Sequence, residues 1–115
     1  MQIVDAPMDT EYLRREVKAL KGVLDEYGET AAAEMARIAL SGSDKAFLAF
    51  VVSNELWGGA GSIADQAGIN RSREARRSIE VAISALGLEQ IRQGIVNVRT
   101  EMWIDAFSQW HSDGY

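Results

Sequence analysis

The residues of this chain whose types and spacing suggest chemistry lie first in a glycine-rich run, Trp57 to Asp65. Glycine tolerates positive φ angles and lets backbone or ligand approach closely, so such a cluster indicates a tight bend or a binding loop. A bend would be closed by Ser62 and Asp65, whereas a loop would offer backbone amides to an anion or a small ligand. The candidate binding residues are Trp57, Gly58, Gly59, Gly61, Ser62 and Asp65.

Two nucleotide-binding motifs fit this run poorly. Gly59 to Ala64 matches G-x-G-x-x-A, and Glu80 lies near the distance of a ribose-binding acid. A dinucleotide site, however, needs a preceding strand and a parallel sheet, which the flanking residues do not indicate. No lysine follows the glycines, as a phosphate-binding P-loop requires. We therefore expect no nucleotide cofactor and no other cofactor.

The strongest basic cluster follows a segment, Ser62 to Ile69, that has the order of a helix-turn-helix motif. Against a DNA-binding role, Glu74 and Arg77 occupy positions that should be apolar in that motif, and Arg76 can pair with Glu80 one turn on. A solvated helix face is the favoured interpretation, with a DNA-binding regulator as the alternative. The candidate nucleic-acid residues are Arg71, Arg73, Arg76 and Arg77.

Catalytic and metal-binding side chains are sparse. The chain has no cysteine, which excludes disulfides, zinc fingers and thiol nucleophiles. His111, the sole histidine, lies near an end that should fray, so we assign it no role. The carboxylates, such as Glu34 and Glu55, occupy cap or surface positions without the spacing of a calcium loop. We therefore assign no catalytic residue and no metal site, and we rank an enzyme last among the functions considered.

Composition points to one small acidic domain spanning residues 1–115. The chain has 115 residues, of which 47% are hydrophobic, and a formal net charge of −5. That charge disfavours non-specific binding to nucleic acid or anionic lipid. Met1 to Asp5 form neither a basic leader region nor a long apolar run, and no segment is long enough to span a membrane. The expectation is a cytoplasmic protein without a membrane partner.

Apolar residues at helical spacing predict the first two helices. The first begins after Pro7 and ends at Gly28. The second, rich in alanines that permit close helix packing, is expected to bury Met35, Ile38 and Ala39 before ending at Gly42. The apolar positions of the first helix are Leu13, Val17, Leu20, Leu24 and Tyr27.

The next segment, Ser43 to Trp57, is predicted as one helix, because Ala46 to Val52 is apolar all round and polar residues then extend it. A buried strand competes, since phenylalanine and valine favour strands. Ser62 should cap a short helix that ends at Gly68.

A longer helix, opened by Asn70 or Ser72, should bury a stripe from Ala75 to Leu86 and end at Gly87. A last helix should follow Leu88, with a kink at Gly94. Alternation over residues 95–104 also fits a β-hairpin of a winged helix. The aromatic residues Trp103, Phe107 and Trp110 recur at helical spacing and are interpreted as core.

The run from Leu56 to Asp65 resembles the aromatic-Gly-Gly-x-Gly-Ser-hydrophobic-x-Asp signature of small uncharacterised bacterial helical proteins. The resemblance implies an all-helical bacterial domain. Small acidic proteins of this kind often resemble immunity proteins, the neutralising partners of toxins, and this analogy suggests a protein partner.

The sequence thus predicts an all-α, single-domain orthogonal bundle of five or six helices that acts by binding, first of all to another protein. The alternatives are a helix-turn-helix regulator and a module that binds an anion or small ligand at Gly58 to Ser62. The oligomeric state stays open.

Overall fold

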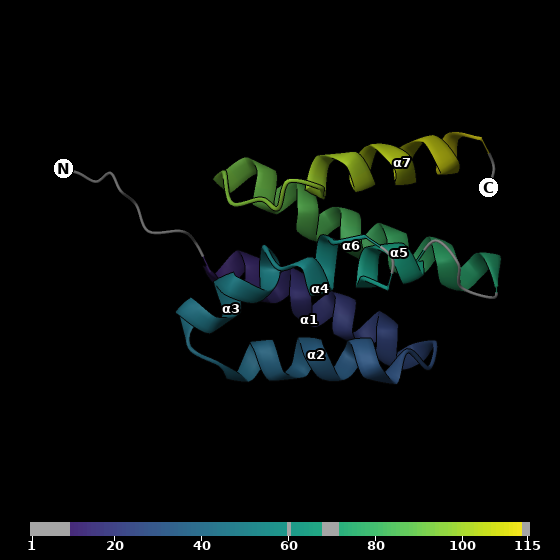
Figure 1. Ribbon diagram of the computed structural model, residues 1–115. Helices are drawn as coiled ribbons and strands as arrows, with labels where there is room; N and C mark the ends of the chain where they lie inside the picture. The colour runs from purple at the N-terminus through teal and green to yellow at the C-terminus, as the bar shows by residue number, and fades with distance from the viewer. Residues whose placement is uncertain (1–9, 60, 68–71, 114–115) are drawn as a thin grey trace.

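The computed structural model describes residues 10–59, 61–67 and 72–113, and within these ranges every regular element is a helix. The all-α prediction is therefore confirmed. Two of the seven helices have only four and five residues, so the longer ones match the expected number. In chain order the helices of Figure 1 are α1 (Thr10–Glu26), α2 (Thr30–Ser41), α3 (Asp44–Val51), α4 (Asn54–Trp57), α5 (Ile63–Ala67), α6 (Arg73–Gln93) and α7 (Thr100–Ser112).

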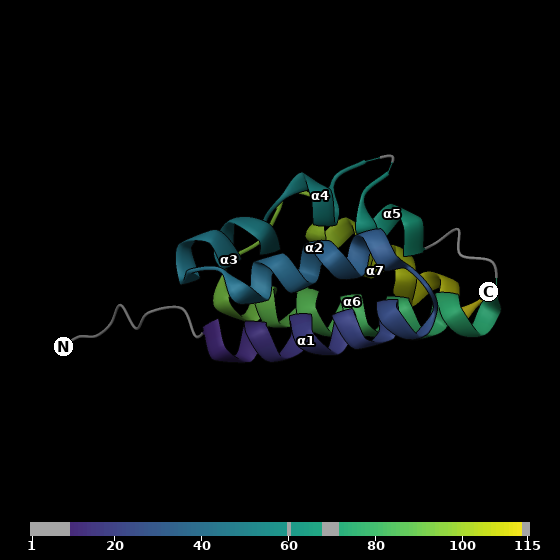
Figure 2. The same ribbon diagram turned by 90° about the horizontal axis from the view of Figure 1, so that it is seen from below.

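The long helices lie side by side in the order α2, α1, α6, α7 (Figure 1). The first helix packs against both α2 and α6, and α6 packs in turn against α7. The short helices α3, α4 and α5 run along one face of this array (Figure 2). As a result, α6 has neighbours on several sides and forms the centre of the bundle.

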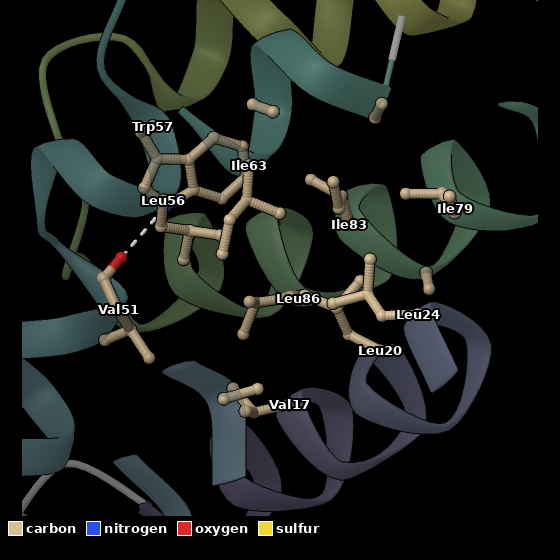
Figure 3. Packing of buried hydrophobic residues seen from close by; sticks show 14 of the residues in the cluster. Val17, Leu20, Leu24, Val51, Leu56, Trp57, Ile63, Ile79, Ile83 and Leu86 are labelled. Atoms are coloured by element: carbon tan, nitrogen blue, oxygen red, sulfur yellow. Dashed lines mark hydrogen bonds between the residues drawn. The ribbon is translucent and has the colours of Figure 1, made fainter. Parts of the chain in front are cut away.

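The core fills the space between α1, α6 and the short helices (Figure 3). The predicted stripe of α1 is buried from Leu13 to Leu24, and it faces Ile79, Ile83 and Leu86 of α6. Burial of each such side chain contributes about 1.5–3 kcal/mol, so this interface accounts for much of the stability. Both stripes were predicted correctly, because their spacing leaves one face of each helix apolar.

The turn between α1 and α2 follows the prediction, whereas the buried face of α2 follows it only in part. Gly28 has φ +78° and ends the first helix as expected. Ile38, predicted to be buried, is 58% exposed, and Met35 is only half-buried. The face of α2 toward the core consists of alanines, Ala33, Ala36 and Ala39, of which Ala39 is buried as predicted. These small side chains let the backbones of α1 and α2 approach closely, which a stripe of larger residues would prevent.

The segment predicted as one helix after Ser43 is broken in the middle. Ser43 caps α3 by accepting a hydrogen bond from Ala46 N, as predicted. The helix then ends at Val51, and the hydroxyl of Ser53 caps α4 by accepting from Leu56 N at 3.3 Å. A serine that bonds a backbone amide in this way begins a new helix rather than continuing the old one. The competing strand prediction is wrong.

Gly87 does not end α6, which continues to Gln93 and is capped by Gly94 in the left-handed region at φ +76°. A Cβ atom on Gly87 would collide with Ile104 of α7 and would lie 3.0 Å from the ring of Trp57. This glycine therefore permits close packing inside a helix. A local sequence pattern cannot distinguish that role from a helix end.

Residues 95–99 form a loop, so neither the kinked helix nor the β-hairpin predicted there is correct. The side chain of Asn97 bridges this loop to the break between α3 and α4, donating to Val52 O at 2.8 Å. Beyond the loop, Trp103 and Trp110 each lie 5.7 Å from Phe107 between ring centroids. The aromatic stripe therefore lies on one face of α7, as predicted.

Candidate functional site

The glycine-rich run forms a closed bend between α4 and α5. Ser62 Oγ donates to Gly58 O at 2.7 Å and accepts from Asp65 N at 3.1 Å. In return, Asp65 Oδ2 accepts from Gly61 N at 3.0 Å. This reciprocal pattern resembles a capping box and confirms that Ser62 and Asp65 close the bend. The amides of Gly61 and Asp65, which a bound anion would use, are thereby engaged within the chain.

Two of the three candidate glycines have structural reasons to be glycine. A Cβ atom on Gly58 would lie 2.5 Å from Asn54 O, a backbone atom that has no freedom to move away. Gly61 has φ +88°, a conformation that other residues rarely adopt. Gly59 is exposed, and a Cβ atom there would lie at an ordinary 3.6 Å from Arg99 Nη1. Only Gly59 therefore lacks a structural requirement.

The side chain of Trp57 lies entirely in the core (Figure 3). Its indole Nε1 donates to Val51 O at 2.9 Å and to Gln90 Oε1 at 3.2 Å. The amide of Gln90 donates in turn to Val51 O and to Ile95 O. The backbone oxygen of Trp57 accepts from Trp103 Nε1 at 3.0 Å. Trp57 therefore holds the loops together and is not available to contact a partner.

Beside the bend lies a cavity of about 310 Å³, whose lining comes from five helices and Gly61. Its apolar wall includes Leu24 of α1, Ile63 of α5 and Ile79 of α6, all labelled in Figure 3. Glu29, before the start of α2, and Glu55 of α4 contribute carboxylates. None of the lining residues, all within the described ranges, is a lysine, an arginine or an aromatic residue. The cavity is thus apolar and acidic.

The segments that carry this cavity are acidic along their length. Residues 22–36 and 46–70 together hold six aspartates and glutamates and no lysine or arginine. The first segment connects α1 to α2, and the second contains α4 and α5. Lys21 and Arg37, just outside these segments, pair with Asp25 and Glu34, so the acidic surface is confined to the rim of the cavity, whose lining holds Glu29 and Glu55 and no lysine or arginine. This surface should attract cations and repel nucleic acid. We call it the acidic face.

The predicted arginine cluster is spread over different environments. Arg71 lies outside the described residues, Arg73 is exposed, and Arg76 and Arg77 are half-buried. Tyr27, in the turn after α1, contacts the same turns of α6, where its hydroxyl donates to a carboxylate oxygen of Glu74 at 3.1 Å. The first turns of α6 are therefore flanked by other side chains and by acids. Arg73 is the one described arginine of the cluster that is clearly exposed.

The structure corrects the roles assigned to Glu80 and His111. Glu80 is only 1% exposed, and its Oε1 lies 2.8 Å from Nε2 of His111 on α7. Arg76, the partner expected from the sequence, acts on Glu80 through its charge, whereas the hydrogen bond comes from the histidine. The other oxygen of Glu80, Oε2, has no hydrogen-bond partner within the described part of the chain.

Burial raises the pKa of Glu80 above its ordinary value of 4.5. The hydrogen bond from His111 and the charges of His111, Arg76 and Arg77 act in the opposite direction. A helical-wheel argument could have placed each residue on the core-facing side of its helix, but not shown that the two meet. Glu80 lies one helical turn before Ile83 on the buried side of α6, and His111 lies four residues after the buried Phe107.

A second, more open groove of about 560 Å³ lies between α6 and α7. Val81 and Leu88 line it and are 58% and 56% exposed. Its polar lining includes Asp105 and His111, so one acid and one histidine share it. The groove therefore lacks the one-sided charge of the cavity beside the bend.

Among the described residues, no three histidines, aspartates or glutamates are grouped so that they could hold a metal ion. None of the described helices is both long and apolar enough to cross a membrane. Comparisons of the chain with protein-family models, with curated proteins and with solved structures found no match.

Proposed function

We propose that this protein is a binding module for another protein that presents a basic surface, and that the acidic face around the cavity is the contact. The observation that carries the proposal is the lining of the cavity, which includes two glutamates and no lysine or arginine. Charge of one sign speeds the encounter with a partner of opposite charge and excludes partners of the same charge. The apolar wall adds contact area that charge alone does not supply.

A neutralising role fits this proposal. An immunity-like protein must cover the working surface of its target, and enzymes that act on nucleic acids carry basic surfaces. The net charge of −5 complements such a surface. A bacterial source and a cytoplasmic location belong to the same proposal, since the analogy with immunity proteins implies them.

The test is capture of a partner with charge-reversed variants. Tagged wild-type protein and the variants Glu55→Lys and Asp105→Lys are incubated with extract from the source organism, and the captured proteins are identified and purified. Glu55 is exposed on α4 at the cavity, and Asp105 is exposed on α7, which does not line the cavity. Both variants change the charge equally, so only the place of the change differs.

We expect a basic partner that binds wild-type protein and Asp105→Lys alike and binds Glu55→Lys at least about tenfold more weakly, with affinity falling as salt rises. Equal capture by all three proteins would contradict the proposal. So would submicromolar binding to duplex DNA at physiological salt that Arg73→Ala abolishes, because this would identify a DNA-binding regulator.

A further inference from the structure

The helix α2 has more apolar surface than its contact with α1 needs. It is the outer helix of the array (Figure 1). Its polar residues recur at intervals of four and three residues and so form one narrow stripe: Thr30, Glu34, Arg37 and Ser41. The rest of its circumference is apolar, whereas packing on one neighbour takes an apolar stripe about 100° wide. Because Ala33 and Ala36 already face the core, Met35 and Ile38 belong to a second apolar face.

This second face lines a groove that consists of two hollows. The cavity of about 310 Å³ beside the bend adjoins another hollow of about 340 Å³, since Met35 and Glu55 line both. Along α2 the groove runs from Ala31 to Ile38, which is seven residues or about 10 Å. The short helices form the opposite wall with Ala46, Ala49 and Phe50 of α3, Glu55 of α4, and Ile63 and Ala67 of α5. We call it the α2 groove.

Of the peptide forms that proteins recognise in grooves, an amphipathic helix suits the α2 groove best. A peptide strand needs an exposed sheet edge, and the described part of the chain contains no strand. A proline-rich peptide needs several aromatic rings, whereas the lining of the two hollows holds only Phe50. A phosphorylated peptide needs arginines, which this lining lacks. An amphipathic helix needs an apolar groove about two turns long, as Ala31 to Ile38 provide.

We propose that the α2 groove binds an amphipathic α-helix of the partner protein. This inference rests on the proposed function, since the partner supplies the helix, and it adds the form of the contact. Apolar side chains at positions i, i+3 or i+4 and i+7 of that helix enter the two hollows. Glu55 is exposed where the hollows adjoin, so a basic residue on the flank of the helix pairs with it. The apolar contacts supply most of the affinity, because an exposed ion pair contributes little.

Helical docking can be tested with random peptides before the partner is known. A displayed library of linear peptides of about 16 residues, enough for four helical turns, is selected against the full chain. The affinities of the enriched peptides are then measured for the wild type, Ile38→Ser and Val81→Ser. Ile38 in the α2 groove and Val81 on α6 are both 58% exposed. The two substitutions therefore remove equally exposed apolar side chains without changing the charge.

We expect the enriched peptides to carry apolar residues at i, i+3 or i+4 and i+7, with no proline between them. Ile38→Ser should weaken their binding at least about fivefold, because the docked helix covers this side chain, whereas Val81→Ser should bind like the wild type. Methyl NMR spectra give a second measurement that needs no variant. The bound peptide should shift the signals of Met35, Ile38 and Ile63, which lie along both hollows.

A selection that enriches no peptide, or peptides without the helical period, would overturn helical docking. So would equal binding to Ile38→Ser and the wild type, or a dimer in sedimentation that Ile38→Ser dissociates, since a second copy would then occupy the groove.

The two proposals fail separately. Partner capture that Glu55→Lys weakens, with peptide binding that does not depend on Ile38, would refute only the helical docking. Helical peptides bound in the α2 groove, with no basic partner captured from the extract, would refute only the proposed function.

Discussion

The glycine bend and the contact between α6 and α7 use their polar groups in opposite ways. In the bend, Ser62 and Asp65 exchange hydrogen bonds with the backbone and close the turn. Between α6 and α7, the buried Glu80 is bonded through one oxygen to His111, while its other oxygen has no partner in the described part of the chain. The most conspicuous sequence pattern therefore marks a self-contained turn, whereas two inconspicuous residues form a contact that leaves one oxygen of a buried carboxyl group without a partner.

The largest expected effect tests the closed bend. Gly58→Ala should lower the free energy of unfolding by about 2–3 kcal/mol, because its Cβ would overlap the backbone oxygen of Asn54. Gly59→Ala is the matched control and should change stability by less than about 0.5 kcal/mol. Urea unfolding of both variants measures the difference. Equal stability of the two variants would show that close approach does not explain the bend.

The next effect tests the buried pair. His111→Ala should destabilise the protein by about 2 kcal/mol at neutral pH, because it leaves both oxygens of Glu80 without a bond. In a Glu80→Gln background the same substitution should cost clearly less, since no buried carboxyl group then loses its partner. A double-mutant cycle by chemical denaturation measures this coupling. Additive effects of the two substitutions would mean that the pair is not energetically linked.

The pH dependence of stability provides a second test of the buried pair, Glu80 and His111. The pKa of Glu80 is raised by burial, so its contribution to stability is fully present below pH 4.5 and is lost as pH rises through the raised value. Glu80→Gln removes this loss and should be more stable than the wild type by about 1 kcal/mol at alkaline pH. Thermal melting from acid to alkaline pH would show it. A wild-type advantage that grows with pH would contradict the assignment.

The smallest effect concerns the arginines. Arg73→Ala should change neither stability by more than about 0.5 kcal/mol nor partner affinity, because Arg73 is exposed and lies outside the residues that line the cavity. Melting curves and the partner-binding assay check both points. A large loss of affinity would show that the partner contacts the start of α6 and not the acidic face.

Much of the fold follows from local patterns. The leucine and valine spacing of α1 and the stripe of α6 fix which faces are buried, and Gly28 and Ser43 mark helix ends. The predictions of secondary structure are wrong where the role of a residue depends on a contact with another helix. Gly87 has the sequence context of a helix end, but its role is set by Ile104 of another helix.

The candidate sites show the same difference between features set by local sequence and features set by packing between helices. Closure of the bend by Ser62 and Asp65 was predictable, because both residues act within a few positions of one another. The cavity was not, since its lining comes from five helices and its charge is defined by two segments apart in sequence. Glu80 and His111 likewise meet only through the packing of α6 against α7.

The most direct test of the account compares three variants for affinity to the purified partner: Gly59→Ala in the bend, Arg73→Ala in the arginine cluster and Glu55→Lys at the cavity. The account predicts that the first two bind like the wild type, whereas Glu55→Lys binds at least about tenfold more weakly at physiological salt. Loss of binding in Gly59→Ala or Arg73→Ala, with Glu55→Lys unaffected, would contradict the central claim that the acidic face makes the contact.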